Sequence, residues 1–171
     1  MRLFSNARAM FGLALLGCVV LLAVALYLQY GLGQQPCPLC YVQRLEVMLF
    51  ALICLLATLH NPAHKGRKVY AWLLLLTALA GIATAGRQIW LQHLPKDQLP
   101  ACLPPLDFML EALPLQEVIM KMLHGSSDCA EIGWTFLGLN IAQMSMISFL
   151  GMLVWSLILL LRRFPCDTIF K

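Results

Sequence analysis

Four long apolar segments constrain the fold of this chain more than any other feature. They cover approximately residues 11–30, 41–59, 69–91 and 141–161. A helix rises about 1.5 Å per residue, so each segment is long enough to cross a hydrocarbon core about 30 Å thick. The chain of 171 residues is 61% hydrophobic and only 12% charged, which is too little charge to cover a soluble domain. The sequence therefore predicts an all-α integral membrane protein, an antiparallel four-helix bundle forming a single membrane domain over residues 1–171.

The first apolar segment follows a short basic stretch, as the core of a secretory signal peptide does. Its apolar run is longer than a usual signal core, and no convincing small-residue cleavage site follows it. We therefore expect an uncleaved first span.

The distribution of Lys and Arg predicts the orientation of the bundle. The residues before the first span, the 60–68 loop and the tail after residue 161 hold nearly all Lys and Arg outside the spans. The 31–40 loop has none, and the long 92–140 loop has two Lys against six carboxylates. By the positive-inside rule, both termini and the 60–68 loop are cytoplasmic, and the other two loops face outward.

The long outer loop has two patterns of its own. Residues 99–106 are apolar and rich in proline, so we expect them to be extended. Residues 115–123 carry apolar side chains at the i, i+3, i+4, i+7 spacing of an amphipathic helix, which is too short to span a membrane. We expect this helix to lie along the outer membrane surface. The alternative is that it packs on a small core within the loop.

A Cys-Pro-Leu-Cys motif, Cys37 to Cys40, stands where the second apolar segment begins. Helix N-termini favour thiolates because their backbone N–H groups are unpaired. Pro38 suits the first helical turn, since its missing N–H would be unpaired there in any case. Arg44 lies one turn below Cys40 on the same helix face and adds positive potential. These features together predict a reactive thiol at Cys40.

Two further cysteines, Cys102 and Cys129, lie in the long outer loop. A structural disulfide is one interpretation, because an even number of cysteines on an oxidising face indicates disulfides. The apolar, proline-rich flank of Cys102 favours a second one, in which a redox partner grips this segment and exchanges a labile disulfide. The missing second Cys-x-x-Cys and the oxidising face argue against zinc, and we expect no metal site.

The remaining three cysteines have no such context. Cys18 and Cys54 fall in the middle of spans, where cysteine behaves as a small hydrophobe. Cys166 follows the last span on the cytoplasmic side, and we expect a free thiol there.

Charged residues within spans are expensive and therefore suggest function. Arg44 is near the outer interface, where the alternative is that it extends to the lipid headgroups. Glu46 is deeper and needs a partner, and Arg87 of the third span lies at a comparable depth. We hypothesise a Glu46–Arg87 ion pair.

Several motifs together resemble the bacterial disulfide bond formation protein B (DsbB) family. They are the run Cys-Pro-Leu-Cys-Tyr-Val-Gln-Arg over 37–44, the pair Cys102 and Cys129, and the sequences over 127–131 and 134–139. The resemblance covers the whole chain, including the four spans, the topology and both cysteine pairs. It implies a thiol:quinone oxidoreductase of the bacterial inner membrane, with its amphipathic helix in the second periplasmic loop.

The resemblance also implies partners and an electron path. The partners would be a DsbA-type periplasmic thiol oxidase, the membrane quinone pool (ubiquinone or menaquinone) and the lipid bilayer, and not nucleic acid. Reduced DsbA would attack Cys102 and free Cys129, which would then attack Cys37. Cys40 would be left as a thiolate beside the quinone, held by Arg44.

One position departs from the family pattern. Some members have a histidine near the quinone on the third span, and the best match here is Gln88, beside Arg87. Either Arg87 or Gln88 is therefore expected to supply the polar contact to the quinone.

Two alternatives remain open, one from another class and one within the enzymes. The chain could be a non-catalytic membrane assembly factor with structural disulfides. It could also be a related four-helix reductase like the vitamin K epoxide reductases, which have a different cysteine arrangement.

Overall fold

The structure is a computed structural model, and it describes residues 6–104 and 106–162. Cys166 and the basic tail around it lie outside the described residues.

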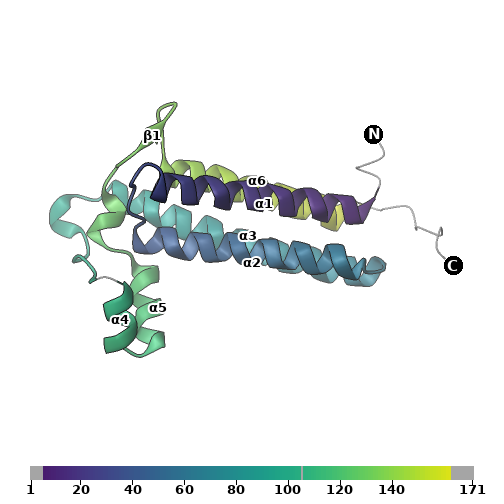
Figure 1. Ribbon diagram of the computed structural model, residues 1–171, viewed down its shortest axis with the longest axis horizontal. Helices are drawn as coiled ribbons and strands as arrows, with labels where there is room; N and C mark the ends of the chain where they lie inside the picture. The colour runs from purple at the N-terminus through teal and green to yellow at the C-terminus, as the bar shows by residue number, and fades with distance from the viewer. Residues whose placement is uncertain (1–5, 105, 163–171) are drawn as a thin grey trace.

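Four long helices form the body of the molecule (Figure 1). They are α1 (Ala7–Tyr30), α2 (Pro38–His60), α3 (His64–Gln92) and α6 (Ile141–Leu161). Each is long and apolar enough to cross a membrane. Along the chain these helices alternate in direction, so they form an antiparallel bundle (Figure 1). The predicted fold class is confirmed.

Helix α3 is the centre of this bundle. It packs along both α2 and α6, and α1 packs along α2, whereas α1 and α6 touch each other little. Gly81 lets α3 approach α6 closely, because an added Cβ there would lie 2.2 Å from the ring of Phe149. The buried core of the bundle also includes Phe11, Phe50 and Leu74.

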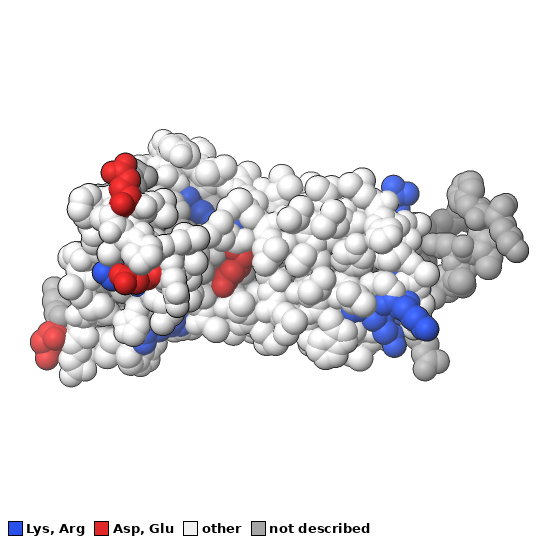
Figure 2. Space-filling model, turned by 90° about the horizontal axis from the view of Figure 1, so that it is seen from below, with Lys and Arg blue, Asp and Glu red and all other residues white. Residues whose placement is uncertain are grey.

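The outside of the bundle is apolar along most of its length. Its exposed large side chains include Leu16, Val20, Leu45, Leu52, Leu76 and Leu150. Figure 2 shows a cluster of Lys and Arg at one end, most of the acidic side chains together with further Lys and Arg toward the other, and a largely uncharged surface between them. Lipid rather than water suits such a surface, because apolar area is costly to expose to water.

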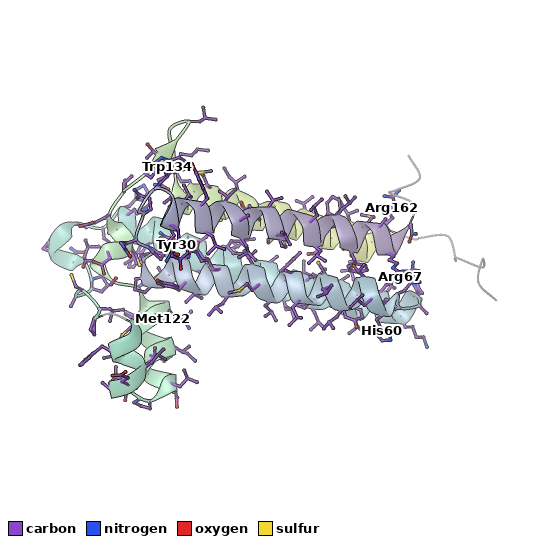
Figure 3. All side chains as sticks on the ribbon, viewed as in Figure 1. Tyr30, His60, Arg67, Met122, Trp134 and Arg162 are labelled. Atoms are coloured by element: carbon purple, nitrogen blue, oxygen red, sulfur yellow. The ribbon has the colours of Figure 1, made fainter. Side chains whose placement is uncertain are left out.

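The two ends of the bundle differ in composition. His60, Arg67 and Arg162 lie at what we call the basic end (Figure 3). Tyr30 and Trp134 lie at the opposite end, which we call the cysteine end because Cys37 and Cys40 begin α2 there (Figure 3).

The connection between α3 and α6 forms a cap of short elements over the cysteine end. They are η2 (Lys96–Gln98), α4 (Leu106–Ala112), α5 (Leu115–His124), η3 (Ser127–Ala130) and the paired strands β1 (Thr135–Phe136) and β2 (Leu139–Asn140). The strands are joined through Leu137 and Gly138, both with positive φ (53° and 79°). This geometry is that of a two-residue hairpin turn.

The predicted amphipathic helix is α5, and its existence is confirmed. Val118 and Met122 are buried against Met109 of α4, with Tyr41 and Val42 of α2 packed beside them. This face therefore packs on a small core, as in the alternative that we considered. Leu115, Ile119, Met120 and Leu123 remain exposed. Contact of that exposed face with the membrane surface stays a prediction.

Candidate redox site

The first turn of α2 positions Cys37 and Cys40, which we call the inner pair. Cys37 is the residue before the helix, with extended backbone, and Pro38 is its first residue. The Cys37 and Cys40 sulfurs are 2.9 Å apart. Cys37 is buried and Cys40 is half-buried. The predicted helix-mouth position of this pair therefore brings both sulfurs together beneath the loop cap.

Cys129 reaches the same place from the loop. The short helix η3 begins after Gly125, whose φ of +79° a side chain would disfavour. An added Cβ at Gly125 would also lie 2.7 Å from Leu91 Cδ1 and 3.1 Å from Leu39 Cδ1. This close packing presses η3 onto the ends of α2 and α3. Cys129 is consequently 1% exposed, in one cluster with Cys37.

The contact between Cys129 and Cys37 shifts the pKa values of the two thiols in opposite directions. A hydrogen bond with Cys129 raises the pKa of Cys37 well above its usual range, and the nearby Cys40 and burial act in the same direction. The hydrogen bond from Cys37 lowers the pKa of Cys129 to about 6 in spite of burial, helped by hydrogen bonds from the backbone of Ser126 and Leu39. Of the two thiols in contact, Cys129 is therefore the one that ionises more readily.

Cys102 lies apart from these three sulfurs, on the surface. Its side chain is exposed, and its Sγ is 3.0 Å from Ser127 Oγ. Ser127 is only two residues before Cys129 along η3. The structure therefore brings Cys102 beside η3, which carries Cys129, but of these two cysteines it leaves only Cys102 exposed.

Two buried glutamines complete the surroundings of the inner pair. Gln88 Nε2 is 3.6 Å from both Cys37 Sγ and Cys40 Sγ. Gln43 Nε2 donates a hydrogen bond of 2.9 Å to Gln88 Oε1. The expected quinone contact of either Arg87 or Gln88 stays a prediction, and in this structure the Gln88 amide nitrogen is directed to the sulfurs. Gln43 was not predicted as a site residue, although it lies one helical turn after Cys40.

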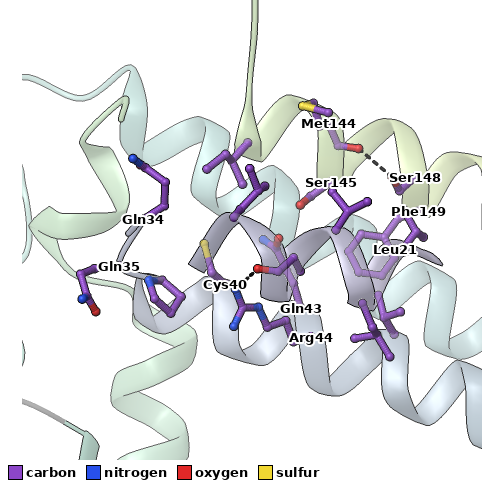
Figure 4. Close-up of a pocket in the computed structure, with 17 residues that line it drawn as sticks. Leu21, Gln34, Gln35, Cys40, Gln43, Arg44, Met144, Ser145, Ser148 and Phe149 are labelled. Atoms are coloured by element: carbon purple, nitrogen blue, oxygen red, sulfur yellow. Dashed lines mark hydrogen bonds between the residues drawn. The ribbon is translucent and has the colours of Figure 1, made fainter. Parts of the chain in front are cut away.

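An apolar cavity of about 180 Å³ opens beside Cys40, between α1, α2 and α6. Figure 4 shows Cys40, Gln43 and Arg44 on its α2 side and Ser145 and Ser148 on its α6 side. Helices α1 and α6, which form two of its walls, touch each other little. The cavity therefore places an apolar space next to Cys40.

Arg44 is held in this cavity wall by α1. Its Nη1 donates to Gln29 Oε1 and its Nη2 to the carbonyl oxygen of Ala25, the latter at 3.0 Å. The guanidinium also lies over the Tyr41 ring, 5.9 Å from its centroid. These contacts fix Arg44 within the bundle, in place of the alternative in which it extends to the headgroups.

A second cavity, of about 400 Å³, lies on the loop side of the same sulfurs. Its lining is more polar and includes Gln92, Asp128, Glu131 and Asn140. Cys40 lines both cavities. The inner pair thus separates a polar space under the loop from an apolar space between the helices.

The predicted Glu46–Arg87 pair is wrong. Glu46 Oε2 accepts a hydrogen bond of 2.8 Å from Thr84. Arg87 turns toward the loop, where its Nη2 donates to the carbonyl oxygen of His124 at 3.2 Å and its guanidinium lies 4.4 Å from the Trp90 ring centroid. Arg87 follows Thr84 by nearly one turn of α3, so it lies closer to the cysteine end than Glu46 does. Arg87 does not line the cavity beside Arg44.

The other two described cysteines have apolar surroundings. Cys18 and Cys54 are 2% and 0% exposed, within the apolar core of the bundle. Their position agrees with the interpretation of both as small hydrophobes.

The fold and the site together define a class of protein, a multi-pass membrane protein with convergent thiols at one end of a four-helix bundle. Comparison with known proteins gives the family. The sequence model of the family described as "Disulfide bond formation protein DsbB" matches residues 7–159. The chain belongs to the DsbB family, whose name places it in disulfide bond formation.

Individual relatives are similar over nearly their whole length. Disulfide bond formation protein B of Stutzerimonas stutzeri is 52% identical over 159 residues, which cover 93% of this chain and 98% of the relative. Disulfide bond formation protein B 1 of Pseudomonas aeruginosa is 48% identical with the same coverage. Disulfide bond formation protein B of Marinobacter nauticus is 49% identical, covering 93% of this chain and 95% of the relative.

Proposed function

We propose that this protein is a protein-dithiol:quinone oxidoreductase that reoxidises a DsbA-type thiol oxidase in the bacterial periplasm. It would do so from the inner membrane, with both termini in the cytoplasm. One observation carries the proposal: Cys129 is buried against Cys37, while Cys102, at the other end of the same relay, is exposed. This arrangement suits transfer of a disulfide from the inner pair to a protein outside the membrane.

The relay begins with a disulfide between Cys102 and Cys129. A thiolate of the reduced partner attacks Cys102, forming a mixed disulfide and releasing Cys129 as a thiolate. Hydrogen bonds from the backbone of Ser126 and Leu39 lower the pKa of Cys129 and favour this release. The further lowering by the Cys37 thiol applies only when the inner pair is reduced. Exposure of Cys102 and burial of Cys129 decide which sulfur the partner meets.

The released Cys129 then attacks Cys37, which breaks the Cys37–Cys40 disulfide and leaves Cys40 as a thiolate. Gln88 and the start of α2 stabilise this thiolate through N–H groups. The partner's second thiolate attacks the mixed disulfide and frees Cys102. Cys102 in turn attacks Cys129, restoring the outer disulfide and leaving Cys37 and Cys40 reduced. The partner has then lost two electrons and its two thiol protons.

The residues of the apolar cavity fit a quinone. Apolar side chains of α1, α2 and α6 suit its ring, the Arg44 guanidinium supplies donors for a ring oxygen, and Cys40 lines the same wall. A bound ubiquinone or menaquinone would supply the acceptor for two electrons and two protons. Arg44, fixed by Gln29 and Ala25, would orient that acceptor toward Cys40.

The proposal is tested by combining purified protein, a reduced DsbA-type partner and a short-chain ubiquinone. Quinone absorbance and partner thiols should fall together, one quinone for each partner dithiol. Cys37→Ser, Cys40→Ser, Cys102→Ser and Cys129→Ser should each abolish turnover. The matched control is the double variant Cys18→Ala/Cys54→Ala, which should keep activity within about twofold because these thiols only fill the core.

Two results would reject the proposal. If quinone stays oxidised while the partner remains reduced, the chain is not the oxidant of that partner. If Cys40→Ser supports normal disulfide formation in cells, the non-catalytic assembly factor is the better interpretation.

A further inference from the structure

Gln43 and Gln88 form a buried amide pair that the proposed relay does not by itself require. Gln43 is 5% exposed and Gln88 is 4% exposed, on α2 and α3 respectively. Burying two primary amides between membrane helices is costly unless their polar groups are paired. Their position beside the sulfurs therefore calls for a chemical explanation.

The hydrogen bond between the two amides determines which way the Gln88 amide is turned. Gln43 donates to Gln88 Oε1 at 2.9 Å, so the Gln88 carbonyl is turned toward Gln43. The Gln88 amide nitrogen is thereby turned the other way, with Cys37 Sγ and Cys40 Sγ each 3.6 Å from it. The amide has two N–H groups, one for each sulfur.

Such a donor distinguishes the two redox forms of the cysteine pair. A thiolate is an anionic acceptor and makes a strong hydrogen bond, whereas a disulfide sulfur is a weak acceptor. Stabilising the reduced form makes a disulfide a stronger oxidant. An amide turned the other way would present its carbonyl oxygen to the sulfurs and repel a thiolate.

We propose that Gln43 is a positioning residue that fixes the Gln88 amide with its N–H groups toward Cys37 and Cys40, and that this orientation favours reduction of the inner disulfide. The inference deepens the proposed function, since it concerns the step in which Cys129 reduces that disulfide. It assigns Gln88 to the sulfurs and leaves Arg44 as the polar group of the apolar cavity.

The test is the redox equilibrium of the isolated inner pair, measured without quinone or partner. The full chain carries Cys102→Ser and Cys129→Ser, and is equilibrated in glutathione buffers of graded ratio. Acid quenching and a mass-tagged alkylating reagent then give the fraction of the Cys37–Cys40 disulfide. Because neither quinone nor partner is present, this readout is independent of whether the proposed enzyme activity is correct.

The first variant, Gln88→Met, keeps the volume but removes the donor. The equilibrium constant for reduction by glutathione should fall about tenfold, the effect of losing one hydrogen bond to a charged group. Gln88→Asn, a conservative variant with a shorter side chain, keeps an amide and should retain part of the effect.

The second variant, Gln43→Glu, reverses the amide rather than removing it. A carboxylate only accepts hydrogen bonds, so the Gln88 N–H groups turn toward it and the carbonyl oxygen turns to the sulfurs. The equilibrium constant should fall by at least as much as in Gln88→Met. Gln43→Met, which removes the anchor without adding charge, should have an effect of the same sign and smaller size.

A double-mutant cycle shows whether Gln43 acts through Gln88. In the Gln88→Met background, Gln43→Glu should change the equilibrium less than twofold. The control is Thr77→Val, which removes another buried polar group of α3 that bonds only its own helix at Leu73. Thr77→Val should leave the equilibrium unchanged.

Either of two outcomes overturns the inference. Gln88→Met with an unchanged equilibrium would show that the amide does not stabilise the reduced pair. A Gln43→Glu effect that persists at full size in the Gln88→Met background would show that the new carboxylate acts directly on the sulfurs.

Discussion

Cys129 combines two properties that rarely occur in one thiol. Its side chain is 1% exposed, and yet its pKa is lowered to about 6. Burial alone would raise the pKa, because it disfavours the charged form. The donors around the sulfur, Cys37 first and then the backbone of Ser126 and Leu39, outweigh burial. When all four cysteines are reduced, the Cys129 sulfur is thus ionised at neutral pH while it is shielded from outside thiols.

This property gives a pH prediction for Cys129. Its thiolate fraction should be nearly constant above about pH 7 and should fall about tenfold per pH unit well below pH 6, since protonation removes the nucleophile. Alkylation of the fully reduced protein by N-ethylmaleimide, followed at the Cys129 peptide by mass spectrometry, measures this profile. Cys37→Ala should move the midpoint upward, because it removes the largest cause of the shift. A rate that keeps rising to pH 9 in the unsubstituted protein would contradict the assignment.

Arg44 is the residue on which the proposed acceptor site depends most. Arg44→Lys keeps the charge but loses the planar group that reaches Gln29 and Ala25 together. The KM for quinone should rise about tenfold, as expected for one lost charge-assisted hydrogen bond. Formation of the mixed disulfide at Cys102 should change less than twofold. Arg8→Lys, at the basic end, is the matched control and should alter neither quantity.

An equal loss in quinone use and in thiol exchange would contradict this role for Arg44. It would show instead that the substitution disturbs the packing of α1 on α2.

At the scale of elements, the junction between α5 and η3 decides where Cys129 lies. Arg87 of α3 holds the last carbonyl of α5, and Gly125 fits the next residue between Leu39 and Leu91. We therefore interpret Arg87 as a residue that holds the loop on the bundle. From the sequence we expected either Arg87 or Gln88 to contact the quinone.

Arg87→Met separates these two roles. It removes the hydrogen bonds to His124 and the cation–π contact with Trp90. Formation of the Cys37–Cys129 bond after partner binding should slow about three- to tenfold, because the loop loses its fastening, a loss of roughly one hydrogen bond. Rapid acid quenching measures this rate, and the KM for quinone should stay the same. A raised KM with normal exchange would restore the quinone-binding role.

Hydropathy and charge were enough to predict the helices but not the contacts between them. The four apolar segments, the amphipathic pattern of α5 and the position of Cys37 and Cys40 follow from local sequence. The Gln43–Gln88 bond and the failure of the Glu46–Arg87 pair depend on the rotation and axial register of α2 against α3. Hydropathy does not set either quantity, because lipid-facing and core-facing positions here are equally apolar.

In the long loop, too, the sequence predicted a helix but not the contacts between elements. The spacing of apolar residues predicted α5, since an amphipathic helix has a local signature. The burial of Cys129 instead needs Gly125 to meet Leu39 and Leu91, which come from two other elements. The only local signal was Gly125 itself, at the end of the predicted helix.

At the scale of the whole molecule, the inner pair stands between two different spaces. The loop covers a polar cavity on one side, and the helices enclose an apolar cavity on the other, with Cys40 lining both. Bundle and loop thus have separate tasks in the proposed function, one toward lipid and the other toward a soluble partner. The connection between them is the contact of Cys129 with Cys37.

That contact is the central claim, and disulfide mapping of a trapped complex tests it most directly. Oxidised protein is mixed with a DsbA-type partner whose second active-site cysteine is replaced by Ala, so that the mixed disulfide persists. We predict that the quenched complex contains two new bonds, partner to Cys102 and Cys129 to Cys37, with Cys40 free. A complex in which Cys129 is free and the Cys37–Cys40 disulfide is intact would contradict the account.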